Sequence, residues 1–359
     1  MVTGLLIFLM ALGLRLYYVN TAVIDTPIRA DAAKYYTIAN NLLNLGVYSS
    51  QTGTKPVPEI AITPGYPFFI ASVLSMARDN PRFSYGLILN LQAVLGAVIV
   101  LITYLVGLLF LPFWAALAAG LLAALSPHLI VICGYVLTEA LFTFFFMLAV
   151  YLVLQAWLRA ASHLFLCFGL VAGIASLVRP ALGLYPFCVA AGLLLITRPG
   201  KIRLKIAGFI ILGFLVVWGP WSYWKHQAAA NMTVAYSPTA ASFALGIYPD
   251  LIYQDPRLRG FPYMEDPAYT DMSRNFRNAL AVLQERVAAE PARYLYWYAV
   301  GKPLTYWSWS IIAGQGGLLS IRWFHPFTIT TILPMPRSGF PGPSTRCCCW
   351  RHLHVVMCI

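Results

Sequence analysis

The chain has 359 residues, of which 60% are hydrophobic and only 10% are charged, whereas soluble domains carry roughly 25% charged residues. At a mean hydropathy of +0.73, so few ionisable groups cannot cover a water-soluble globule, and most of the surface must face lipid. The 24 Lys and Arg exceed the 12 Asp and Glu, which gives a net charge of +12. Basic residues in the short loops of a membrane protein report orientation, so the charge does not indicate a nucleic-acid partner. The composition predicts an all-α polytopic membrane protein.

Apolar runs long enough to cross a bilayer recur along the chain. A spanning helix needs about 20 mostly apolar residues, and we predict eight such helices, at residues 2–19, 85–111, 113–131, 138–157, 164–178, 181–196, 206–224 and 294–319. The polar stretches 20–84 and 225–293 interrupt the pattern, and we predict that both lie outside the membrane.

The loop at residues 197–205 sets the predicted orientation. It carries four basic residues and no acidic one, so the positive-inside rule places it in the cytoplasm and both long polar stretches outside. The apolar run at residues 64–77 is too short for an ordinary span, and a crossing there would move the basic loop outside. We therefore predict that this run is an interfacial helix on the outer membrane surface.

The predicted organisation has four parts. Residues 1–224 form an N-terminal transmembrane bundle that includes the first outer loop at 20–84, residues 225–293 form a second outer loop, and residues 294–333 supply further transmembrane structure. An amphipathic helix is expected at 272–289 and could lie over a site. Residues 334–359 include three consecutive Cys among Pro, Gly and Arg, which suggests an out-of-frame, truncated end; a palmitoylated cluster is the alternative.

Several ionisable residues fall at helix ends on the predicted outer side, where ionisable groups near hydrocarbon are usually functional. The alternatives are structural: Asp31 as a helix N-cap, Glu139 as a favoured helix-start residue, and Arg179 as a snorkelling side chain. The candidates are Asp31, Lys34, Glu59, Glu139, Arg179 and Lys225.

The same stretches resemble a known superfamily. Residues 29–48 begin near Asp31 and end the helix at Gly46, and a Pro-rich segment leads into the expected interfacial helix. Together with Glu139, Arg179 and the Pro220-Trp221 pair, this order resembles the protein O-mannosyltransferase and lipid A aminoarabinose transferase superfamily, which has the GT-C fold. The resemblance covers about residues 5–326. Two departures are a single acid at Asp31, where many members have two, and Lys225, where the family often has Arg-Asn.

The resemblance implies a glycosyltransferase that moves a hexose or pentose from a polyprenyl-phosphate donor to a hydroxyl of a lipid, glycan or protein. In this reading Asp31 is the general base and Glu59 a second acid, since a carboxylate can take the hydroxyl proton. Arg179, Lys34 and Lys225 are expected to bind the donor phosphate. Tyr35, Tyr66, Glu139 and Trp221 are expected to bind substrate, although the aromatic residues equally suit an interfacial belt.

No His or Cys cluster predicts a metal site, and the resemblance leaves a need for a divalent cation open. We expect an integral protein of the bacterial inner membrane with its active site facing the periplasm, acting on a cell-envelope glycan or lipopolysaccharide. The alternatives are a transporter or flippase for a lipid-linked substrate and a noncatalytic membrane protein. Transporters usually show inverted repeats and charges near the midplane, and the charges here sit at helix ends.

Overall fold

The computed structural model describes residues 2–22, 24, 27, 28, 30–53, 56–76, 80–196, 201–230, 237–249 and 266–307. All of the secondary structure in these residues is helical, which confirms the predicted all-α class. The polar tail at 334–359 lies outside the described residues.

Within the described ranges, four helices are long and apolar enough to cross a membrane: α1 (Val2–Thr21), α4 (Pro81–Phe110), α7 (Glu139–Arg159) and α10 (Lys201–Ala230). They correspond to the runs predicted at 2–19, 85–111, 138–157 and 206–224. The runs at 164–178 and 181–196 are also helical, but α8 (Ser162–Val178) and α9 (Tyr185–Ile196) are shorter. A short 3-10 turn, η2 (Pro180–Leu182), precedes α9.

The run at 113–131 is not the continuous helix that we predicted. It divides into α5 (Phe113–Leu125) and α6 (Pro127–Val131), followed by the 3-10 turn η1 (Ile132–Gly134), and the two parts are bent by 53°. Pro127 explains the break, because a proline favours the first position of a new helix and disfavours helical geometry in the residue before it. The pair counts as a fifth span if it crosses as one unit.

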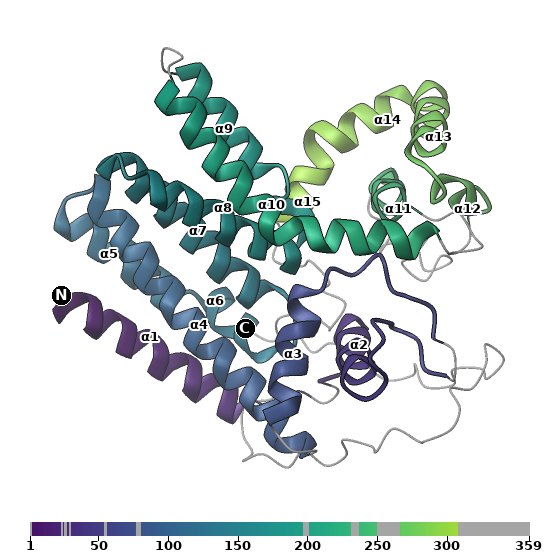
Figure 1. The fold of residues 1–359 in the computed structure, drawn as a ribbon. Coiled ribbons are helices and arrows are strands. Elements are labelled where there is room, and N and C mark those ends of the chain that lie inside the picture. Colours follow the sequence, from purple (N-terminus) through teal and green to yellow (C-terminus); the bar gives the residue numbers. More distant parts are fainter. Residues whose placement is uncertain are drawn as a thin grey trace. The chain divides into compact units, whose positions relative to one another are not determined.

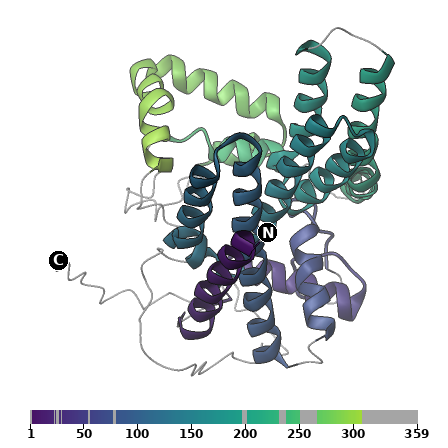
Figure 2. The ribbon, with the colours of Figure 1, turned by 90° about the vertical axis from the view of Figure 1, so that its left-hand side faces the viewer.

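The long helices pack on one another in a bundle (Figures 1 and 2). α1 packs along α4, which also contacts α5 and α7; α7 packs on α8, and α8 on α10. Two helices of the first outer loop, α2 (Asp31–Leu45) and α3 (Gly65–Met76), pack on each other, and α3 also contacts α4 and α8. The loop is therefore attached to the bundle by α3.

Arg15 is a fully buried cation within α1. Its guanidinium donates hydrogen bonds to the carbonyl oxygens of Ala11 (3.1 Å), Ala123 (3.3 Å) and Ala124 (3.3 Å). The last two belong to the final turn of α5, where carbonyls lack helical partners and the macrodipole favours a cation. Arg15 thus ties α1 to the end of α5 beside the bend.

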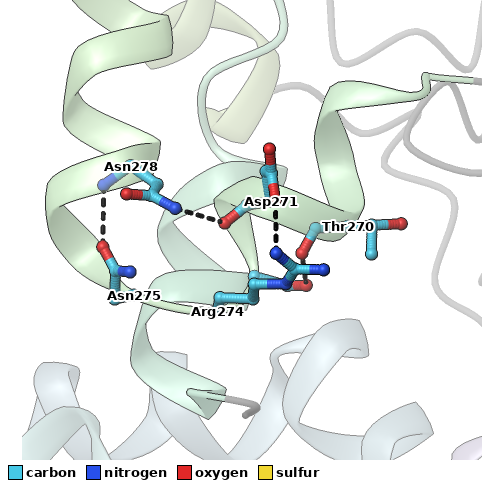
Figure 3. Close-up of polar contacts among 6 residues, drawn as sticks. Thr270, Asp271, Arg274, Asn275 and Asn278 are labelled. Carbon is cyan, nitrogen blue, oxygen red and sulfur yellow. Dashed lines mark hydrogen bonds and ion pairs between the residues drawn. The ribbon is translucent and has the colours of Figure 1, made fainter. Parts of the chain in front are cut away.

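The segment predicted to be the second outer loop contains α11 (Pro238–Leu245), α12 (Ala268–Met272) and α13 (Phe276–Ala289). The prediction of one helix at 272–289 is wrong in its first turn, because α12 ends at Met272 and α13 begins only at Phe276. Asn275 caps α13: its side-chain oxygen accepts a hydrogen bond from the N–H of Asn278 at 2.9 Å (Figure 3). The chain continues through α14 (Pro291–Tyr296), the π-helix η6 (Trp297–Gly301) and α15 (Lys302–Trp307). The remainder of the run predicted at 294–319 lies outside the described residues.

Close packing of α8 on α10 depends on glycine. A Cβ at Gly169 would lie 2.2 Å from the carbonyl oxygen of Ile210, whereas one at Gly208 of α10 would meet nothing within 4 Å. Small residues allow helix backbones to approach in this way within membranes.

We expect Gly169→Ala to destabilise the protein by about 1–3 kcal/mol, because the two helices must separate to admit the methyl group. Gly208→Ala is the matched control and should leave stability unchanged or slightly raised. Thermal unfolding in detergent micelles measures both. Equal melting temperatures for the two variants would contradict the close approach of α8 and α10.

Candidate functional site

The first candidate residues lie on one face of α2. Asp31, Lys34 and Tyr35 are spaced so that their side chains are neighbours on a helix, and the Lys34 ammonium lies 3.7 Å from the Asp31 carboxylate. Asp31 occupies the first turn, and Ala30 is the N-cap. The alternative that Asp31 caps this helix is therefore wrong, and its carboxylate is 61% exposed.

Glu139 and Arg179 meet across the helical hairpin of α7 and α8. An Arg179 guanidinium nitrogen donates to a Glu139 carboxylate oxygen at 2.8 Å, with 44% and 32% of the two side chains exposed. Glu139 begins α7 and Arg179 follows the last residue of α8, positions at which the helix dipoles favour their charges. Arg179, which was predicted to bind the donor phosphate, is thus paired with the carboxylate of Glu139.

Tyr35 connects this ion pair to α2. Burial raises the pKa of Tyr35 to about 12; the charges of Asp31 and Glu139 add to the rise, and Arg179 and the Thr138 hydroxyl oppose it. These groups therefore surround one phenol, which stays protonated at neutral pH and can donate a hydrogen bond. The structure brings Asp31, Lys34, Tyr35, Glu139 and Arg179 together at the predicted outer ends of the helices.

Tyr66 supports Tyr35 from α3. The two rings pack edge to face, with centroids 5.2 Å apart and an interplanar angle of 78°. Tyr66 is fully buried, and its hydroxyl donates to the Gln92 side-chain oxygen at 2.7 Å. Tyr66 therefore lies behind the cluster rather than on its open surface.

Glu59 is engaged within its own loop. The Ser50 hydroxyl donates to one of its carboxylate oxygens, and the N–H of Ala61 donates to the other at 2.8 Å. Its negative charge also adds to the rise in the pKa of Tyr48, which burial mainly causes. These contacts order the segment that leads into α3.

Trp221 and Lys225 lie on α10. Trp221 is 9% exposed, and its ring contacts those of Tyr48 at 5.3 Å and Trp224 at 4.8 Å. This aromatic cluster holds the first loop against α10. Within the described part of the chain, Lys225 forms no ion pair with the carboxylates of the site, so its ammonium remains unneutralised there.

Two buried polar residues of the bundle were not identified from the sequence. They are Gln92, within α4, and Arg15, within α1. The sequence could have indicated both residues, because each is a polar side chain within an apolar spanning run. Such a side chain is costly to bury in a membrane and usually has a specific partner. Among the described residues no group of three or more His, Cys, Asp or Glu could hold a metal ion.

The second outer loop has its own core, in which the α11, α12 and α13 residues pack with Tyr294 of α14. Asp266 accepts hydrogen bonds from Arg286, Tyr248 and the N–H of Ala268. Burial alone would raise the pKa of Asp266, but these hydrogen bonds outweigh it and lower the pKa below its ordinary value. That this loop covers the site stays a prediction.

A carboxylate with a lowered pKa stabilises the folded state above its ordinary pKa of 3.8 and loses that contribution as the pH falls through the lowered value. We therefore expect Asp266→Asn to speed hydrogen exchange in α11 and α13 at pH 7, with a difference from wild type that shrinks near pH 3. The control is Asp271→Asn, since Asp271 is exposed and forms a surface ion pair with Arg274 (Figure 3). A difference that grows on acidification would contradict this assignment.

The residues at 54–224 match the family model described as dolichyl-phosphate-mannose-protein mannosyltransferase. No curated protein matches the chain. The matched segment includes Glu59, Tyr66, Glu139, Arg179 and Trp221, and it begins after Asp31, Lys34 and Tyr35 and ends at the residue before Lys225. The match confirms the resemblance to GT-C glycosyltransferases, and with the apolar helices it indicates an integral-membrane glycosyltransferase similar to mannosyltransferases.

Proposed function

We propose that the protein, as an integral-membrane glycosyltransferase related to the mannosyltransferase family, transfers a sugar from a polyprenyl-phosphate donor to an acceptor hydroxyl on the outer side of the membrane. The observation that carries this proposal is the cluster of Asp31, Glu139 and Arg179 around the phenol of Tyr35. Transfer needs a base for the hydroxyl proton and a cation for the leaving phosphate, and the cluster contains both. We also propose that the protein lies in the bacterial inner membrane.

In the proposed reaction Asp31 accepts the acceptor's proton. Its side chain is exposed, and so is that of its neighbour Lys34, so an acceptor hydroxyl can approach the Asp31 carboxylate. The acceptor oxygen forms a bond to the anomeric carbon as the bond from that carbon to the phosphate oxygen breaks. The electron pair of the broken bond leaves with the polyprenyl phosphate.

Arg179 is the proposed phosphate ligand, because its planar guanidinium matches phosphate oxygens in two parallel hydrogen bonds. Glu139 holds this side chain at 2.8 Å before the donor arrives. The donor phosphate therefore competes with Glu139 for the guanidinium. Lys34 and Lys225 are secondary cations, and direct contact of the sugar with Tyr35, Tyr66, Glu139 or Trp221 stays a prediction, as does a catalytic role for Glu59.

We expect Asp31→Asn to reduce sugar transfer by about 10²–10⁴-fold, the usual contribution of a general base. The measurement is transfer by the full chain in lipid nanodiscs, from labelled polyprenyl-phosphate sugars to a panel of hydroxyl acceptors.

The matched control for Asp31→Asn is Asp271→Asn. Both aspartates begin an i,i+3 pair with a basic residue and are similarly exposed, at 61% and 64%. The control should transfer sugar at the wild-type rate. Equal rates for Asp31→Asn and wild type would remove Asp31 as the base, and no transfer by the wild type from any donor would reject the proposed function.

We expect Arg179→Ala to raise the KM for the donor at least tenfold, since a charged hydrogen bond contributes about 1.5–3 kcal/mol and 1.4 kcal/mol corresponds to a factor of ten. Glu139→Gln should shift the donor KM in the opposite direction, because the phosphate then meets no competing carboxylate. Arg274→Ala in the second outer loop is the control. A donor KM that rises in Glu139→Gln would show that Glu139 does not compete with the phosphate.

A further inference from the structure

Gln92 is a fully buried amide in the apolar helix α4. Its side-chain nitrogen donates to the carbonyl oxygens of Cys133 (3.0 Å) and Tyr135 (2.8 Å), and its side-chain oxygen accepts from the Tyr66 hydroxyl at 2.7 Å. Both amide protons are used, so the partners determine which way the amide points. Gln92 therefore joins the stretch after α6 to the start of α3.

The carbonyl partners of Gln92 lie just before the proposed site. Cys133 belongs to η1, and Tyr135 follows it. The next residues lead to Thr138, which is buried, and to Glu139, the first residue of α7. Because the Gln92 amide nitrogen donates to both carbonyls, it fixes the path of the chain as it enters α7. It thereby also fixes the position of the Glu139 carboxylate.

The Tyr66 side of the amide fixes the other half of the ion pair. Tyr66 follows Gly65, where a Cβ would lie 2.8 Å from the backbone carbonyl of Leu177. The Thr63 hydroxyl donates to the carbonyl oxygen of Val178 at 3.2 Å. The start of α3 thus abuts the last turn of α8, and Arg179 is the next residue along the chain.

The same tyrosine also supports the phenol at the centre of the site. The edge-to-face contact of Tyr66 with Tyr35 is of a kind that contributes about 0.5–1.5 kcal/mol beyond burial. One amide is therefore connected by contacts to the backbone beside Glu139, to the backbone beside Arg179 and to the ring of Tyr35.

We propose that Gln92 is a positioning residue of the transfer site: it touches no substrate, and it sets the relative placement of Glu139, Arg179 and Tyr35 through backbone carbonyls and Tyr66. The inference rests on the proposed function for its catalytic consequence. No bulk water reaches a fully buried site in an apolar helix, so an apolar side chain at residue 92 removes the hydrogen bonds of Gln92 to the Cys133 and Tyr135 carbonyls and to the Tyr66 hydroxyl with no water to replace them. The Tyr135 carbonyl keeps its bond from the N–H of Leu137 at 2.9 Å, and the segments that Gln92 joined are then free to shift.

The test compares Gln92→Leu with Tyr66→Phe, which removes a single hydrogen bond and keeps the ring. Gln155→Leu is the matched control, because Gln155 is also buried and lies 16 residues along α7 from Glu139, roughly 24 Å away. All variants are full-length chains in nanodiscs. Three quantities are measured: the melting temperature, hydrogen exchange by mass spectrometry, and kcat and KM for sugar transfer.

We expect faster hydrogen exchange at residues 63–68 and 133–139 in Gln92→Leu, a smaller increase in Tyr66→Phe and none in Gln155→Leu. We expect kcat to fall about 100-fold in Gln92→Leu, the size of effect that a misplacement of about 1 Å produces, and about tenfold in Tyr66→Phe. KM should stay within threefold, because the residue makes no substrate contact.

Unchanged exchange in both segments would overturn the proposal, and so would a lower melting temperature accompanied by a wild-type kcat for the folded fraction. If Gln92→Leu does not fold, the proposal is judged by the same two outcomes in Tyr66→Phe. The expected exchange pattern in variants of a protein that transfers no sugar would support the positioning by Gln92 and reject the proposed function.

Discussion

A polar group inside an apolar helical bundle must find its hydrogen-bond partners within the protein, and this constraint organises the structure around the site. The two terminal guanidinium nitrogens of Arg15 in α1 and the amide of Gln92 in α4 donate to backbone carbonyls where helices end or begin: Arg15 to the last turn of α5, Gln92 to the stretch between α6 and α7. Such carbonyls lack helical partners of their own. The break between α5 and α7 is therefore held by side chains from two other helices.

The sequence predicted the long spans well because a run of about 20 apolar residues has few alternatives to a membrane helix. It did not predict the bend within 113–131, since the run is apolar enough overall to read as one span and the break depends on Pro127. It likewise predicted one amphipathic helix where α12 and α13 are separate, because the cap at Asn275 depends on a backbone geometry that hydrophobic periodicity does not report.

The sequence pointed to the candidate residues one by one but not to the ion pair that joins two of them. The predicted topology gathered Asp31, Glu139 and Arg179 on one side of the membrane. It could not join Glu139 to Arg179, which are 40 residues apart and meet only because α7 and α8 form a hairpin. The surroundings of Glu59 and Trp221 are also tertiary properties: the first is satisfied by Ser50 and Ala61, and the second is packed against Tyr48.

The two ion pairs of the cluster change the electrostatics of binding the proposed donor. Lys34 neutralises Asp31 and Arg179 neutralises Glu139, so the resting cluster is close to charge balance. A sugar linked through a phosphodiester brings one negative charge into it. That charge is favourable where it takes the guanidinium from Glu139, or where it meets a cation outside both pairs, such as Lys225. In the proposed function, selective binding of an anionic lipid at this cluster would thus depend less on the number of cations than on how firmly the backbone at the start of α7 and the end of α8 holds the Glu139 and Arg179 pair.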